Sequence, residues 1–239
     1  MPTAPSQVPD DGVARYRHEA LGVVFRITEG ALTVLAWRRA REPHAGAWAL
    51  PGGPVDPSET LGACVARQLA TRLEIREIAH LEQLETRSDP ARDPNQRTLA
   101  TAYLGLLPIT ARPRLPAGVA WLHATLLPAM AFDHGSIVGS AVERLRSKLS
   151  YSNIAFALAP QEFTVAQLRD IYAAALGREI SATNLQRVLQ RRGQLTPAGR
   201  TATPGSHGGR PAALFRFAHH QLQITDPFAV LRPAAAVRG

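Results

Sequence analysis

A glycine- and proline-rich segment followed by two spaced charged residues constrains this chain more than any other feature. The segment GAWALPGG covers residues 46–53, Glu59 follows its last glycine after five residues, and Arg67 follows after seven more. Ser58 can cap a helix that runs to about Leu73. Apolar residues recur at helical spacing within it, at Leu61, Val65 and Leu69. The pattern therefore predicts a tight loop that leads into an amphipathic helix.

This spacing resembles the Nudix box. In the Nudix family the arginine is followed by a glutamate, and two more glutamates lie four and five residues after the arginine. Those carboxylates hold the divalent metals that hydrolyse nucleoside diphosphate compounds. The three positions are Gln68, Thr71 and Arg72 in this chain. The resemblance thus implies the scaffold of a pyrophosphatase without most of its metal site.

The substitutions predict that this chain binds no Mg²⁺ and has no catalytic residues. Mg²⁺ takes hard oxygen ligands, chiefly carboxylates and substrate phosphates. Arg72 adds a positive charge where a dication should lie, and Glu59 alone could hold one weak metal at best. Glu74 occupies the position at which the family ends this helix with glycine, so we do not expect it to restore the site. Binding without hydrolysis is the prediction.

Charge is divided unequally along the chain. Residues 1–139 contain 14 basic and 14 acidic residues, whereas residues 140–239 contain 13 basic and 5 acidic, a balance of +8. A genomic preference for arginine explains why Lys148 is the single lysine, but it does not explain why acids are depleted in one half. A basic half beside a neutral half predicts a polyanionic partner.

Composition is that of a soluble protein with a packed core. No signal peptide and no apolar run of about 18 residues is present, so we expect a cytoplasmic protein with no membrane contact. The only cysteine is Cys64, on the apolar side of the predicted helix, and we expect a buried structural thiol in preference to a reactive one. Residues 1–14 and 227–239 are predicted to be flexible tails.

The first half of the chain mixes strands with one helix. Two strands are predicted within residues 21–39, joined by a turn at Glu29 and Gly30, and two more at 78–87 and 98–108. With the helix after Ser58, this mixture fits the α/β/α sandwich that the Nudix resemblance implies. We assign it to residues 15–140.

The second half is predicted to be mainly helical. A long helix covers 132–150 and continues toward Pro160 after a break near Ser150. Two shorter helices follow, the first capped by Thr164 and ended by Gly177, the second capped by Ser181 and ended by Gly193. A two-stranded ribbon around a glycine-rich tip comes next. This order is typical of a winged helix-turn-helix DNA-binding domain, which we assign to 141–220.

The second short helix is the predicted DNA-reading element. Leu185, Val188 and Leu189 share one face. The opposite face carries no acid and consists of Thr183, Asn184, Arg187, Gln190 and Arg191. Arginine can donate two hydrogen bonds to guanine, and asparagine or glutamine can pair with adenine. The alternative is an ordinary solvated face, on which glutamate or aspartate would be expected among these residues.

The ribbon is the predicted wing. Its candidate phosphate contacts are Arg200, Thr203, His207 and Arg210, and its glycines would let the backbone approach a phosphate closely. The alternative is a flexible loop without a ligand. The position directly after the basic helix favours the wing.

Taken together, both halves resemble the NrtR family of Nudix-related transcriptional regulators of NAD metabolism. The resemblance covers about residues 20–218. It rests on WALPGG at 48–53, RDP at 92–94, AFDHGSIV at 131–138, EFTVAQLRDIY at 162–172 and GRPAALFRF at 209–217. It implies a homodimer on palindromic operators of NAD biosynthesis or salvage genes, released in many members by an ADP-ribose-like metabolite.

An effector held without metal would need basic side chains around its diphosphate. We nominate Arg39, Glu59, Arg67 and Arg92 as effector-binding residues, with Arg72 as a further candidate. For Asp133, a helix-capping role is at least as plausible as ligand contact.

Three functions remain open at this point. The first is a DNA-binding repressor with an effector-sensing, non-hydrolysing Nudix domain. The alternative is an active Nudix hydrolase of ADP-ribose or a related nucleoside diphosphate compound, against which the missing carboxylates argue. A general RNA-binding protein ranks last, because aromatic residues make up only 6% of the chain and offer no stacking surface.

Overall fold

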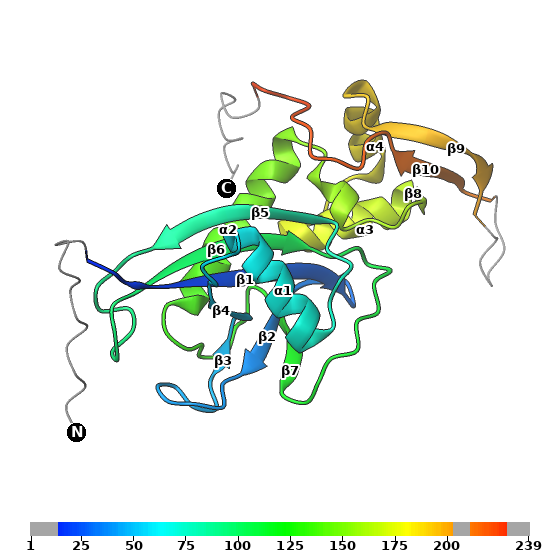
Figure 1. Ribbon diagram of the computed structural model, residues 1–239. Helices are drawn as coiled ribbons and strands as arrows, with labels where there is room; N and C mark the ends of the chain where they lie inside the picture. Colours follow the sequence, from blue (N-terminus) through cyan, green and yellow to red (C-terminus); the bar gives the residue numbers. More distant parts are fainter. Residues whose placement is uncertain (1–13, 203–210, 229–239) are drawn as a thin grey trace, which may run out of the picture.

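The computed structural model describes residues 14–202 and 211–228, which form two sheets with helices around them (Figure 1). The seven-stranded sheet contains β1 (Arg17–Thr28), β2 (Ala31–Arg38), β3 (Trp48–Ala49), β4 (Gly52–Pro54), β5 (His80–Arg87), β6 (Thr98–Leu106) and β7 (Val119–His123). The three-stranded sheet contains β8 (Phe163–Thr164), β9 (Leu195–Thr201) and β10 (Ala213–Phe217). The helices are α1 (Leu61–Leu73), α2 (His134–Tyr151), α3 (Val165–Leu176) and α4 (Ala182–Arg191), with the 3₁₀ helix η1 (Ile154–Ala157).

Strand β1 lies at the centre of the larger sheet. It pairs antiparallel with β2 and β4 and parallel with β6, and β5 pairs antiparallel with β6 at one side. Glu29 and Gly30 join β1 to β2 with φ angles of 51° and 77°. Two successive residues at positive φ match the right-handed twist of a hairpin. The predicted turn is confirmed.

Helices α1 and α2 cover opposite faces of this sheet. Successive side chains of a strand point to opposite faces, and β1 shows it directly. Val24 belongs to the core that packs against α1, where Cys64 and Leu69 are buried. Phe25 belongs to the core that packs against α2, where Ile137 is buried. The predicted α/β/α sandwich and the buried Cys64 thiol are both confirmed.

Helix α1 begins two residues later than predicted. Its N-cap is Thr60, whose hydroxyl oxygen accepts from the backbone N–H of Ala63 at 3.2 Å. Ser58 instead donates both its N–H and its hydroxyl to the carboxylate of Asp56. The prediction of a Ser58 cap is wrong because the preceding aspartate engages that serine in a turn.

The C-terminal part has the predicted order of elements. A reciprocal capping box between Thr164 and Gln167 starts α3, and Gly177 ends it with a φ of 70°. Ser181 caps α4, and β9 and β10 then form the ribbon. The short strand β8 adds a third strand to that ribbon by pairing with β10, which was not predicted. This arrangement is a winged helix.

The two parts share one hydrophobic core. The core under the larger sheet continues from α2 through Phe156 of η1 to Phe163, and on to Phe217 of β10. The segment after β10 then returns to the end of α2, where the N–H of Thr225 donates to the carbonyl of Tyr151 at 2.8 Å. The junction is therefore packed on both sides. Among the described residues, no helix is long and apolar enough to cross a membrane.

Candidate functional site

A cavity of about 690 Å³ opens beside the end of the glycine-rich segment, at Gly52 and Gly53. The backbone lining includes Gly52 and Gly53, and a side-chain carbon at Gly52 would lie 2.4 Å from the carbonyl oxygen of Ala20. Only glycine lets the loop approach β1 this closely. The basic residues of the lining are Arg17, Arg38, Arg39, Arg41 and Arg72. The walls therefore present five guanidinium groups.

Three of these arginines are held against aromatic rings. Their guanidinium carbons lie over ring centroids at 4.2 Å for Arg38 on Trp48, 4.6 Å for Arg39 on Phe132 and 5.4 Å for Arg72 on Trp37. A cation over a ring face is attracted by the ring quadrupole, and the stacking restricts where the guanidinium can lie. The aromatic rings thus organise the positive lining.

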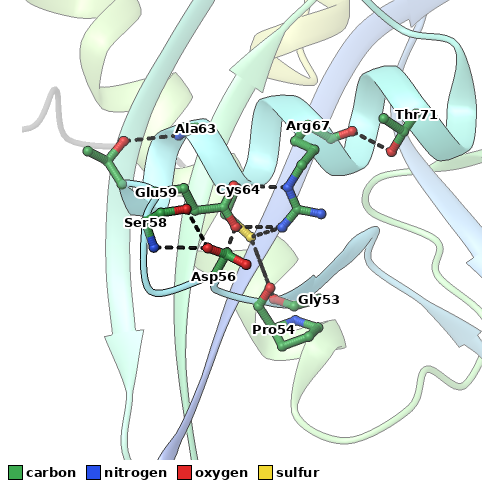
Figure 2. A network of polar contacts seen from close by, with 10 residues as sticks. Gly53, Pro54, Asp56, Ser58, Glu59, Ala63, Cys64, Arg67 and Thr71 are labelled. Atoms are coloured by element: carbon green, nitrogen blue, oxygen red, sulfur yellow. Dashed lines mark hydrogen bonds and ion pairs between the residues drawn. The ribbon is translucent and has the colours of Figure 1, made fainter.

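In α1 and the loop before it, the side chains at the positions of the Nudix motif hydrogen-bond to one another and to the backbone (Figure 2). Arg67 donates from Nε to Glu59 at 2.9 Å, and Arg67 Nη2 pairs with the same carboxylate. These hydrogen bonds from Arg67, followed by the backbone N–H of Asp56, lower the pKa of Glu59 to about 2. The Thr71 hydroxyl donates to the carbonyl of Arg67 at 2.7 Å. The one carboxylate retained from the motif is therefore already paired with a cation.

Cys64, on the same helix, is buried beside this ion pair. Its thiol contacts the carbonyl of Pro54 at 3.5 Å, and burial raises its pKa to about 11. A thiol with a raised pKa carries little of the thiolate that reacts or binds metal. The interpretation of Cys64 as structural agrees with this environment.

The residues at the ligand positions of a Nudix enzyme do not fit a divalent metal ion in this chain. Gln68 is 2% exposed and its amide packs against Gly53, with the Oε1 atom lacking a hydrogen-bond partner. An amide brings no negative charge, and Arg72 brings a positive one. Among the described residues no three His, Cys, Asp or Glu side chains gather closely enough to hold a metal ion. Glu74, after the helix, adopts a left-handed φ of 54° in the position where glycine would be unstrained.

Behind the cavity, a buried ion pair supports the wall. Arg92 donates from Nη2 to Asp133 at 2.8 Å, and the arginine side chain is only 3% exposed. Burial alone would raise the pKa of Asp133, but the hydrogen bonds from Arg92 outweigh it and hold that pKa below its usual value. Asp133 stands at the N-cap of α2 without a side-chain capping bond, so the capping role proposed for it is wrong. Its carboxylate is directed to Arg92 instead.

His134 lies next to this pair and lines the cavity. The backbone N–H of Leu50 donates to its Nδ1 at 3.0 Å, so the ring is held as a neutral acceptor. Burial is the main cause that lowers its pKa to about 3. This histidine lies within the AFDHGSIV segment at 131–138 that carries the family resemblance, but it was not nominated as an effector-binding residue.

Of the nominated effector residues, the structure brings two into the cavity lining: Arg39 and the further candidate Arg72. Glu59 and Arg67 pair with each other outside that lining, and Arg92 is committed to Asp133. Sequence reasoning missed Arg17, Arg38 and Arg41. The last two flank Arg39 in the run RRAR at 38–41, at the end of β2, which was an available signal.

The predicted reading face of α4 is exposed in full. Thr183, Asn184, Arg187, Gln190 and Arg191 all lie in the exposed class, whereas Leu189 on the other side is 2% exposed and belongs to the core. The Nη2 of Arg187 donates to Asn184 Oδ1 at 2.8 Å. The Ser181 hydroxyl oxygen accepts from the backbone N–H of Asn184 at 3.3 Å and so caps the start of this helix. The five polar side chains are thus available to a ligand together.

The wing residues are placed in part. Arg200 on β9 is exposed and pairs with Glu162 at 2.6 Å, so a phosphate would have to compete with that carboxylate. Thr203, His207 and Arg210 lie outside the described residues.

Comparisons with known proteins match both parts. A profile described as the NUDIX domain matches residues 16–138, and one described as the NrtR DNA-binding winged helix domain matches residues 155–217. The ADPR responsive transcriptional repressor NtrR of Acinetobacter baylyi is 30% identical over 211 residues, which cover 85% of this chain and 83% of the relative.

Solved structures agree. Shewanella oneidensis NrtR complexed with a 27mer DNA has a TM-score of 0.72 and 28% identity, covering 83% of this chain and 92% of that one. The NUDIX domain of the same protein complexed with ADP ribose has a TM-score of 0.51 and 27% identity, covering 58% of this chain and 94% of that one.

Proposed function

Because the chain belongs to the NrtR family of Nudix-related transcriptional regulators, we propose that it is a DNA-binding repressor whose Nudix part senses an ADP-ribose-like metabolite. The exposed, acid-free face of α4 carries the proposal. A winged helix places such a helix in the major groove, where arginine and asparagine can read base edges. The similar Shewanella protein, solved with DNA, supports the same use.

The cavity in the Nudix part is the proposed effector site. Its five arginines suit a diphosphate, because guanidinium groups form charge-assisted hydrogen bonds with phosphate oxygens. The relative named as ADPR responsive and the Nudix domain solved with ADP ribose support this ligand class. We further propose that two copies bind a palindromic operator, so that effector binding shifts the spacing of the two reading helices.

Replacing Arg187 or Arg191 by alanine is expected to weaken operator binding by about 1–3 kcal/mol each, because each would lose contacts to a base. Fluorescence anisotropy with DNA fragments recovered by genome-wide footprinting would measure the dissociation constants. Arg114→Ala is the matched control, since it removes the same charge from an exposed site in the Nudix part. If the two α4 variants bind as tightly as this control, α4 is not the reading helix.

We also propose that the Nudix part binds its effector without hydrolysing it. Incubating the full chain with ADP-ribose and either Mg²⁺ or Mn²⁺ is expected to yield no AMP or ribose 5-phosphate by chromatography. The reason is that Glu59, the retained carboxylate, is paired with Arg67, and Gln68 and Arg72 cannot hold a dication. Metal-dependent turnover that disappears in Glu59→Gln would reinstate the hydrolase.

A further inference from the structure

The lining of the Nudix cavity has the charge of an anion site and lacks the carboxylates of a metal site. Its acidic side chain is Glu19, which pairs with Arg17 at 2.8 Å. Within the described residues, no carboxylate lies within ion-pair distance of Arg38, Arg39 or Arg72. These guanidinium groups are therefore not neutralised by any carboxylate that the structure describes.

The donors of these arginines are only partly used. Arg39 donates from Nε to the carbonyl of Pro43 at 2.9 Å, and Arg38 donates from Nη1 to the carbonyl of Gly46 at 2.7 Å. A guanidinium has five N–H donors, so most remain for a ligand. Backbone carbonyls and aromatic rings thus hold these groups in place while their remaining donors stay open. Such a planar, pre-oriented fork matches phosphate oxygens better than a flexible ammonium does.

Arg72 reaches the cavity from a different element than the other arginines. It lies in the last turn of α1, where the partial negative charge of the helix end favours a cation. Its guanidinium stacks on Trp37 of β2, which lies 35 positions earlier in the sequence. Arg39 and Arg72 therefore line one cavity from two separate elements.

From this arrangement, and resting on the proposed effector function, we propose that the cavity grips the diphosphate of its effector without a metal ion. Arg72 and Arg39 supply the positive charge that a bound dication supplies in a hydrolytic Nudix site. A dication placed beside Arg72 would meet repulsion, and the described part of the chain offers no set of carboxylates to offset that repulsion. Arg72 is thus a determinant of metal-independent recognition and not merely a lost ligand.

Isothermal titration calorimetry of the full chain with ADP-ribose and, separately, with inorganic pyrophosphate would test this. Both ligands are expected to bind in EDTA, and excess Mg²⁺ is expected to give no gain in affinity. Arg72→Glu is expected to weaken both in EDTA by at least about tenfold, the loss of one charge-assisted contact. Arg72→Lys should retain part of the affinity. Arg76→Glu makes the same charge change at an exposed site outside this cavity lining and should bind like the wild type.

The outcomes separate this proposal from the proposed function. Binding that requires Mg²⁺, or an Arg72→Glu variant no weaker than Arg76→Glu, overturns the metal-free grip while leaving an effector-sensing repressor intact. Absence of binding by both ligands also overturns it. Metal-free binding that is lost in Arg72→Glu but does not release DNA supports the grip and removes the sensing role. Thermal denaturation of each variant would confirm that the fold is retained.

Discussion

Replacing Asp133 by alanine is expected to lower the free energy of unfolding by about 3–5 kcal/mol, because the change leaves a buried positive charge without its partner. The side chain of Arg92 is 3% exposed and is held by Asp133 at 2.8 Å. Urea denaturation followed by circular dichroism would measure the loss. The same variant should weaken effector binding, since Arg92 also lies 5.9 Å from the ring centroid of Phe132 in the cavity wall.

Two comparisons make this prediction specific. Asp170→Ala breaks the exposed pair with Arg169 and is expected to cost at most about 1 kcal/mol. The double variant Arg92→Met, Asp133→Leu removes both charges and should recover much of the stability lost in Asp133→Ala. A single Asp133 variant no less stable than Asp170→Ala would show that the pair is solvated in solution.

Lowering the pH is expected to decrease the free energy of unfolding through protonation of His134. Its pKa is about 3 in the fold and 6.5 in the unfolded chain, so the unfolded chain binds more protons between these values. The contribution of His134 is therefore complete above about pH 6.5 and is lost progressively as the pH falls toward 3. The loss approaches 1.4 kcal/mol per pH unit, or roughly 3 kcal/mol by pH 4.

The slope of stability against pH separates this histidine from the rest of the chain. Urea melts of His134→Gln between about pH 7 and 4 should show a slope shallower by about one proton, although the variant is less stable at neutral pH. His219→Gln, at an exposed position, should keep the wild-type slope. An unchanged slope in His134→Gln would mean that the ring is protonated in the fold without penalty.

Local signals in the sequence predicted the elements with strong periodicity or capping. The hairpin at Glu29 and Gly30, the capping residue Thr164 and the exposed face of α4 all depend on neighbours within a few positions. Strands β3 and β4 lie within the segment predicted as a loop, because strands of two or three residues show no alternation. Strand β7 was missed as well, and it is fixed by pairing with β2.

The composition of the site could be predicted only where the motif is local. The residues that replace the glutamates of the motif, Gln68, Thr71 and Arg72, can be read directly from the sequence. The pairing of Arg92 with Asp133 joins residues 41 positions apart, and nothing in either segment indicates it. The cavity likewise combines the end of β2, the end of α1 and the start of α2. Such combinations arise from tertiary packing, so no local signal could show that Arg92 pairs with Asp133 outside the cavity lining.

The segment after β10 restricts movement between the Nudix part and the winged helix. It holds the end of α2 through Tyr151 and the end of α4 through Arg192, which pairs with Asp226 at 2.7 Å. Since the interior is also continuous across this junction, the two parts have little freedom to bend against each other. If two copies bind the operator as proposed, a ligand in the cavity would therefore move each copy as one rigid body. The change that releases DNA would then occur at the contact between the two copies.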